Sequence, residues 1–185
     1  MKKNLILVIF VGLLLTLNQS LSAQEETIAS KLFYAELCGP GVLMSINWDA
    51  RFNPNSHLGF GYRIGAGFSN GEVNGELITS SSGDSYYTRI TRNYYTIPVG
   101  LNYVFGKPNV ASAFEVGAGA TFLTRKVSIF NHEIKKPGHV IGFFTFMYRF
   151  TPVKGGFSLR LGFTPLIGTS GELSPMCSLS FGYAF

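Results

Sequence analysis

Six polar side chains in two predicted connections are of the types that carry out nucleophilic or metal chemistry. They are Asp84, Ser85, Ser128, His132, Glu133 and His139. A nucleophile and its base must lie within hydrogen-bond reach of each other, and no motif or spacing among these residues indicates that they do. The two histidines and Glu133 also match no defined metal-ligand spacing. The sequence therefore predicts no catalytic residue, no metal site and no cofactor.

A second group of charged residues stands inside largely apolar stretches, where isolated charge is costly. Its members are Glu36, Asp49, Arg51, Arg63, Glu115, Arg149 and Arg160. If these side chains face one enclosed space, the three acids and four arginines must be paired and hydrogen-bonded. The group predicts an interior ion-pair network that fixes strand register. A gated polar path for small solutes stays open as an alternative.

The stretches that carry these charges have the length of strands. A membrane-spanning strand needs about 9 to 11 residues, and the candidates are 31–38, 42–52, 57–68, 94–105, 111–123, 140–150, 157–167 and 175–185. The content of 22 Gly, 17 Phe and 9 Tyr favours strands joined by turns over helices. We predict an all-β fold, an eight-stranded antiparallel up-and-down barrel over residues 31–185, with 39–41 as a tight turn.

Alternation sorts each strand into two faces. Phe60, Tyr62 and Ile64 alternate with Gly61 and Arg63, and a period of two puts these sets on opposite sides of a sheet. The apolar face is predicted to point outward, and the face of Gly, Ser, Thr and Arg inward. Because an eight-stranded barrel is only wide enough for its own side chains, a filled lumen is predicted rather than a pore.

The positions of lysine distinguish a membrane barrel from a soluble ligand-binding barrel, which would bury the apolar face. The lysines beyond the N-terminus fall at strand ends or in connections, at Lys31, Lys107, Lys126, Lys135, Lys136 and Lys154. Lysine is costly where a strand faces lipid. This distribution favours a transmembrane barrel.

The N-terminus has the pattern of a secretory signal peptide. Lys2 and Lys3 precede an apolar run from Leu5 to Leu17, and small residues lead up to Ala23. We predict a signal peptide at 1–23 and a short segment at 24–30. Beyond it the chain has no apolar run of about 18 residues, although 46% of all residues are hydrophobic and only 14% are charged. Without Lys2 and Lys3 the formal charge of +5 falls by two, which is too little to indicate nucleic-acid binding.

Connections alternate between short and long, as in barrels with a periplasmic and an outer end. The short ones, 53–56, 106–109 and 151–156, are predicted to be periplasmic, and the long ones, 69–93, 126–139 and 168–174, extracellular. Aromatic residues near strand ends are predicted to form girdles at the membrane interfaces. They are Tyr34, Trp48, Phe52, Tyr94, Tyr95, Phe105, Phe122, Phe150, Tyr183 and Phe185.

Basic residues cluster in the predicted outer loops and the adjoining strand ends. Candidate contacts with lipopolysaccharide phosphates are Arg89, Arg92, Arg125, Lys126, Lys135 and Lys136. A merely solvated surface stays open, because acids such as Glu72 and Glu76 dilute the cluster. Cys38 and Cys177 lie near the outer ends of the first and last strands, but alternation points one inward and the other toward lipid. Whether they pair stays open.

The closing residues Phe181-Gly182-Tyr183-Ala184-Phe185, with the signal peptide and the eight strands, resemble the small outer-membrane β-barrel proteins of Gram-negative bacteria. The resemblance covers residues 31–185 and implies an outer-membrane location. It also implies that Phe181, Tyr183 and Phe185 form an insertion signal for the barrel-assembly machinery. Some barrels of this kind are lipid-modifying enzymes, which keeps that alternative open. We expect a non-enzymatic monomer in contact with membrane lipid, serving envelope integrity or surface interaction.

Overall fold

Antiparallel strands pair with their neighbours around a closed ring in the computed structural model, which describes residues 28–79, 85–127, 138–168 and 171–185. The predicted signal peptide lies outside these residues. The strands are β1 (Lys31–Leu37), β2 (Met44–Arg51), β3 (Gly59–Thr79), β4 (Ser85–Gly106), β5 (Ser112–Val127), β6 (Gly138–Phe150), β7 (Gly156–Phe163), β8 (Leu166–Ile167), β9 (Leu173–Ser174) and β10 (Cys177–Ala184). No helix in these ranges is long and apolar enough to cross a membrane.

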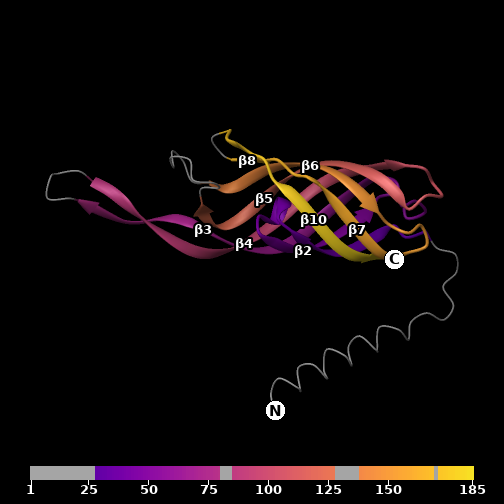
Figure 1. Cartoon of the computed structure of the whole chain (residues 1–185), viewed down its shortest axis with the longest axis horizontal. Coiled ribbons are helices and arrows are strands. Elements are labelled where there is room, and N and C mark those ends of the chain that lie inside the picture. Colours follow the sequence, from indigo (N-terminus) through magenta and orange to yellow (C-terminus); the bar gives the residue numbers. More distant parts are fainter. Residues whose placement is uncertain (1–27, 80–84, 128–137, 169–170) are drawn as a thin grey trace, which may run out of the picture.

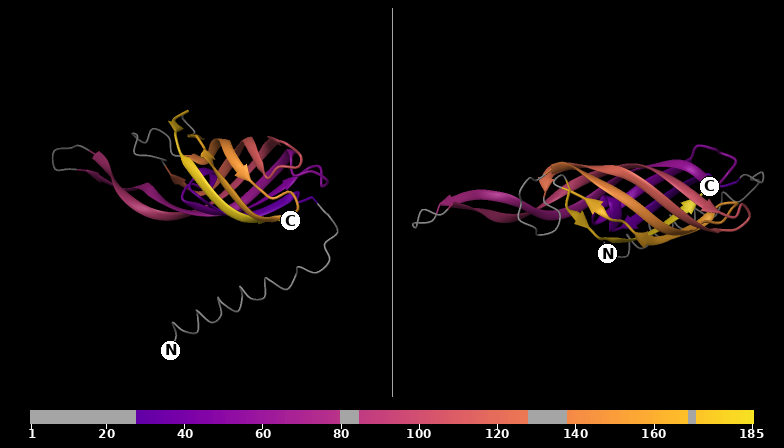
Figure 2. Two further views of the ribbon diagram at one scale, coloured as in Figure 1. Left: turned by 45° about the vertical axis from the view of Figure 1, so that its right-hand side comes forward. Right: turned by 90° about the horizontal axis from the view of Figure 1, so that it is seen from above.

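Eight of the strands make the ring, and β8 and β9 extend it at one end. The order is β5-β4-β3-β2-β1-β10-β7-β6, and pairing of β5 with β6 closes it. The first and last strands are neighbours, with Phe33 opposite Tyr183 and Glu36 opposite Ser180. Figure 2 shows the strands tilted around a common axis. The predicted eight-stranded antiparallel barrel is confirmed.

The two faces follow the predicted alternation. Along β1 every second residue is buried, and in β4 Leu101 is 59% exposed while Asn102 is 2% exposed. Phe60, Tyr62 and Ile64 of β3 point outward, and Arg63 is buried. This arrangement reverses that of a water-soluble protein, because the apolar side chains cover the outside.

The β3–β4 hairpin corrects one predicted boundary. Residues 69–93 were expected to form a loop, yet β3 continues to Thr79 and β4 starts at Ser85, with Val73 opposite Ile90. The β-branched and aromatic residues of this stretch favour strand, despite its Ser, Gly and charges. In Figure 1 the hairpin projects beyond the barrel at the end opposite the C-terminus.

The strand predicted at 157–167 is interrupted. β7 ends at Phe163, and β8 pairs with β6 instead of continuing along β10. Pro165 lacks the amide hydrogen that a central strand needs. The amide of Thr164 turns to donate to the carbonyl of Met176 at 2.6 Å.

The segment 39–41 forms a tight turn between β1 and β2, as predicted, and the amide of Val42 donates to the Gly39 carbonyl at 2.9 Å. It is a 3-10 turn, η2 (Gly39–Gly41), whose three residues are all buried, which the sequence did not indicate. Cys38 before it and Val42 after it have φ angles of 59° and 73°, and such left-handed values are rare for residues other than glycine. The chain uses them to fold this connection back into the barrel mouth, where Thr96 and Thr121 donate hydrogen bonds to the carbonyls of Gly41 and Pro40.

Candidate functional site: the filled barrel interior

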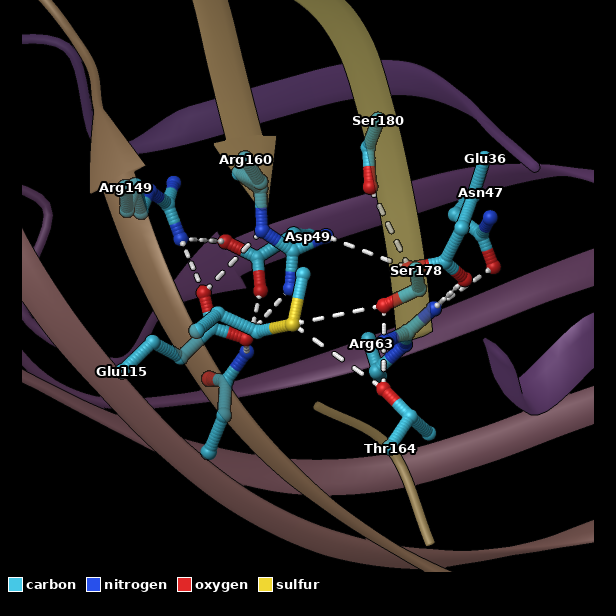
Figure 3. Close-up of polar contacts among 12 residues, drawn as sticks. Glu36, Asn47, Asp49, Arg63, Glu115, Arg149, Arg160, Thr164, Ser178 and Ser180 are labelled. Carbon is cyan, nitrogen blue, oxygen red and sulfur yellow. Dashed lines mark hydrogen bonds and ion pairs between the residues drawn. The ribbon is translucent and has the colours of Figure 1, made fainter. Parts of the chain in front are cut away.

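All seven charged residues predicted to face inward are buried inside the barrel. They come from six strands, with Glu36 on β1, Asp49 and Arg51 on β2, Arg63 on β3, Glu115 on β5, Arg149 on β6 and Arg160 on β7. Figure 3 shows the charged groups facing one another across the lumen. The sequence separations are large, so only the closure of the ring brings these groups together.

The upper part of the network, which is the part nearer the β3–β4 hairpin, centres on Glu36. Arg63 Nη2 lies 2.6 Å from Glu36 Oε2, and Ser180 Oγ donates to Glu36 Oε1 at 3.2 Å. Arg160 Nη1 is farther away, 3.8 Å from Glu36 Oε1. Arg63 also donates to the Asn47 side-chain carbonyl at 3.2 Å.

The lower part is held more tightly. Arg160 binds Glu115 through both Nε, at 3.2 Å, and Nη2, at 2.5 Å. Arg149 Nη1 bridges the two acids, 3.2 Å from Glu115 Oε2 and 3.1 Å from Asp49 Oδ1. Arg51 Nη2 lies 2.7 Å from both oxygens of Asp49, and Asn102 donates to Asp49 at 2.5 Å. The ion pairs therefore form one alternating chain with an arginine at each end.

Tyr34 packs against two of these arginines. The Arg160 guanidinium carbon is 4.4 Å from the centre of the Tyr34 ring, and that of Arg63 is 5.5 Å away. The prediction of Tyr34 and Tyr94 as interfacial girdle residues was wrong, since they are only 1% and 3% exposed inside the barrel. Tyr34 precedes Glu36 by two positions, so the alternation that put Glu36 inside also put Tyr34 there.

Inward-facing glycines make room for the large interior side chains. A Cβ added at Gly182 would meet Tyr34 atoms, and one at Gly61 would meet the Arg51 guanidinium. The same holds for Gly162 beside Met147. The inward-facing glycines therefore leave space inside the barrel, and arginine, tyrosine and methionine side chains from neighbouring strands fill that space.

An apolar layer fills the barrel mouth at the end that carries the β3–β4 hairpin. Tyr94, Leu123, Ile141, Phe143 and Leu166 form a buried cluster, with Val42 and Met176 packed against it. Gly39 of η2 donates its amide hydrogen to Met176 Sδ at 2.9 Å, which ties the turn to this layer. Sequence reasoning missed the layer because Ile141 and Phe143 are as apolar as their outward neighbours in 140–150, so alternation at these two positions shows no polar face.

Large apolar and aromatic side chains cover the outer surface. Many are close to the barrel end that carries the short connections, where Phe60 packs on Tyr103 at 4.8 Å and Trp48 on Phe185 at 5.5 Å between ring centres. The predicted girdle residues Phe52, Tyr95, Phe105, Phe122, Phe150, Tyr183 and Phe185 are all exposed. Exposed aromatic residues therefore occur at both ends of the barrel, because Tyr95 lies opposite Phe68 where the β3–β4 hairpin begins.

The remaining predicted site residues lie at the surface or outside the described residues. Phe181, Tyr183 and Phe185 are exposed on or next to β10. Arg92 and Arg125 are exposed near the outer end. The side chains of Arg89 and Lys126, and Lys135 and Lys136 altogether, fall outside the part of the chain whose side chains the structure describes.

The residues weighed for catalysis and disulfide formation are not brought together where the structure describes them. His139 Nδ1 is within 3.1 Å of the Leu123 carbonyl, while Asp84, Ser128, His132 and Glu133 lie outside the described residues. Cys38 and Cys177 are both free thiols. Within the described ranges, no three His, Cys, Asp or Glu side chains form a metal-binding group.

No family model and no curated protein sequence matches the chain. Among solved structures, the N-terminal β-barrel domain of Pseudomonas aeruginosa OprF is similar with a TM-score of 0.49 and 11% identity, over 88% of this chain and all of that one. The outer membrane protein Ail of Yersinia pestis, in a phospholipid nanodisc, is similar with a TM-score of 0.47 and 14% identity, over 86% of this chain and all of that one. The fold itself is assigned from the closed ring of this chain, an eight-stranded antiparallel barrel with a polar interior and an apolar exterior.

Proposed function

We propose that the protein is a non-enzymatic, non-conducting barrel of the bacterial outer membrane, exported by its signal peptide. Its role in this proposal is structural, with the outer hairpin as a surface for contact. The observation that carries the proposal is the inverted distribution of side chains, in which paired charges fill the interior and apolar groups cover the wall.

The outer wall supports a location in lipid. Phe60, Leu101, Phe157 and Leu161 are each more than half exposed, and such a continuous apolar surface is not tolerated on a soluble monomer. Backbone polar groups in a bilayer must be satisfied internally, and a closed barrel has no open edge. The ring of paired strands meets this requirement.

The filled interior supports a structural role over the alternative of a small-solute channel. A continuous wet path would have to pass the paired arginines and then the apolar mouth layer with η2. The enzyme alternative needs a histidine within reach of Ser128 or Asp84, and both of these residues lie outside the described part of the chain.

The β3–β4 hairpin supports a role in surface interaction. Pairing of β3 with β2 ends at Phe68, and pairing of β4 with β5 ends at Thr96. Beyond these points the described strands pair only with each other, so the backbone offers two open edges to which an extended partner can add. Lipopolysaccharide contact at Arg92 and Arg125, insertion through the residues at the end of β10, and a monomeric state remain part of the proposal.

Two measurements test the membrane location and the orientation. The mature chain refolded in detergent should migrate as a compact band that shifts only on boiling, and its Trp48 fluorescence should be quenched by brominated lipid. An epitope inserted between Thr79 and Ser85 should be labelled on intact cells, whereas the same epitope after Lys107, in a short turn, should be labelled only after permeabilisation. Folding in water without detergent, or labelling of the turn on intact cells, would contradict the proposal.

A further inference from the structure

The interior ion-pair chain carries one more positive than negative charge. It alternates Arg63, Glu36, Arg160, Glu115, Arg149, Asp49 and Arg51, so four guanidinium groups share three carboxylates. The side chains of this chain are at most 5% exposed. Uncompensated charge at such depth is strongly unfavourable, so the excess positive charge needs a balancing negative charge.

The chain has one weak junction. Five of its six contacts are 3.2 Å or shorter, while Arg160 Nη1 and Glu36 Oε1 are 3.8 Å apart. A separation of this size is an ion pair without a hydrogen bond. The upper pair, Arg63 with Glu36, is neutral, so the excess charge belongs to the part of the chain that begins at Arg160.

The unpaired polar atoms gather at the same junction. Seven buried side-chain atoms lack a hydrogen-bond partner among the described residues, and four of them are Tyr34 OH, Arg63 Nε, Arg63 Nη1 and Arg160 Nη1. The other three belong to Arg51, His57 and Thr145. All four atoms at the junction are hydrogen-bond donors, and a buried donor without a partner is destabilising.

The surroundings of these donors are apolar or already occupied. The Tyr34 ring packs against both guanidinium groups, and Phe143 lies near Arg63 with its ring centre 5.7 Å from the guanidinium carbon. Glu36 is the carboxylate at this place, and its oxygens are engaged by Arg63 and Ser180. Glu115 binds Arg160 through Nε and Nη2. Among the described residues, Arg160 Nη1 is left without a hydrogen-bond partner.

We propose that the junction binds a single monovalent anion such as chloride, held by Tyr34, Arg63 and Arg160. An anion accepts hydrogen bonds from donors of this kind, and it also neutralises the excess positive charge, which a water molecule does not. Glu36 opposes the anion by repulsion, and the two flanking arginines offset that repulsion. The anion therefore completes the alternating chain where its protein contacts are weakest.

The first test uses the wild-type barrel refolded in detergent. Its unfolding midpoint should rise in a saturable manner when gluconate is replaced by chloride at constant ionic strength, with bromide acting like chloride. Crystals grown in bromide should show one anomalous peak between Arg63 and Arg160. Equal midpoints in both salts, or bromide at the surface alone, would overturn the proposal and leave an uncharged occupant such as water.

A matched pair of variants localises the effect. Tyr34→Phe removes one donor at the junction and should weaken the apparent chloride affinity at least about tenfold. Tyr94→Phe makes the same chemical change in the mouth layer and should leave the affinity unchanged. An equal loss in both variants would contradict the assignment. If Tyr34→Phe fails to refold, the bromide position in the wild-type crystal still decides.

Discussion

The charged layer and the mouth layer fill the same barrel by opposite means. Below, Asp49, Glu115 and their arginines are held by directed ion pairs, within β2 and between β2, β5, β6 and β7. Above, Phe143 and Leu166 pack in an apolar cluster that connections complete. The lower layer depends on partners at defined positions, whereas the upper layer depends on filled volume. A narrow barrel thus combines a layer that specifies register with a layer that excludes water.

Removal of one shared acid should have the largest effect on this contrast. Glu115→Gln removes one charged partner from Arg149 and the hydrogen-bonded partner from Arg160. Arg160 then keeps only the 3.8 Å contact with Glu36, so the free energy of unfolding should fall by about 3–5 kcal/mol. Urea unfolding in lipid vesicles measures it. The exposed Glu172→Gln is the control, and a similar small change in both variants would show that the network is not stabilised by charge pairing.

A cavity in the mouth layer should cost slightly less. Leu166 is 1% exposed within the cluster, and Leu166→Ala should lower the free energy of unfolding by about 2–4 kcal/mol. Leu173→Ala provides the control, because Leu173 is 65% exposed. The same unfolding assay compares them. If the two leucine variants behave alike, the mouth is not a packed layer.

The outward-facing wall offers a third test, because we place charged groups only in the interior and apolar groups against lipid. Leu101 points outward near the middle of β4, and Leu101→Arg should destabilise the inserted barrel by about 2–4 kcal/mol. Asn109→Arg, in a short turn, should change little. Refolding yield into vesicles and urea unfolding both report the difference. An arginine tolerated equally at both positions would place the wall in water.

The smallest loss of stability is expected where the pairing of β4 with β5 ends and the β3–β4 hairpin begins. The Thr124 hydroxyl accepts from the Tyr95 amide at 3.0 Å and lies 3.3 Å from the Tyr95 carbonyl, so it replaces a ladder partner where pairing ends. Thr124→Val should cost about 0.5–1.5 kcal/mol. Hydrogen exchange should speed up at Tyr95 but remain unchanged at Leu101. Unaltered exchange at Tyr95 would mean that the hydroxyl does not cap the ladder.

The sequence was sufficient to predict which strand residues face inward wherever polar and apolar residues alternate. Arg63 and Arg160 were assigned inward because small residues flank them at a period of two, and the structure puts them there. Tyr34 obeys the same alternation, but its aromatic character suggested an interface. Met176 was assigned to the predicted strand 175–185, but β10 begins only at Cys177. Pro40 could not be assigned to a face, because a connection that folds into the lumen leaves no periodic signal. The length of the β3–β4 hairpin was missed because its Ser, Gly and charges resemble those of a loop.

The central claim is that the two layers together close the lumen. Single-channel recording of the wild-type barrel in a planar bilayer tests it most directly, with a triple variant Ile141→Ala, Phe143→Ala and Leu166→Ala as the opened control. We expect no resolved conductance from the wild type and measurable openings from the triple variant. Steady openings of the wild-type barrel would contradict the claim and favour the small-solute channel.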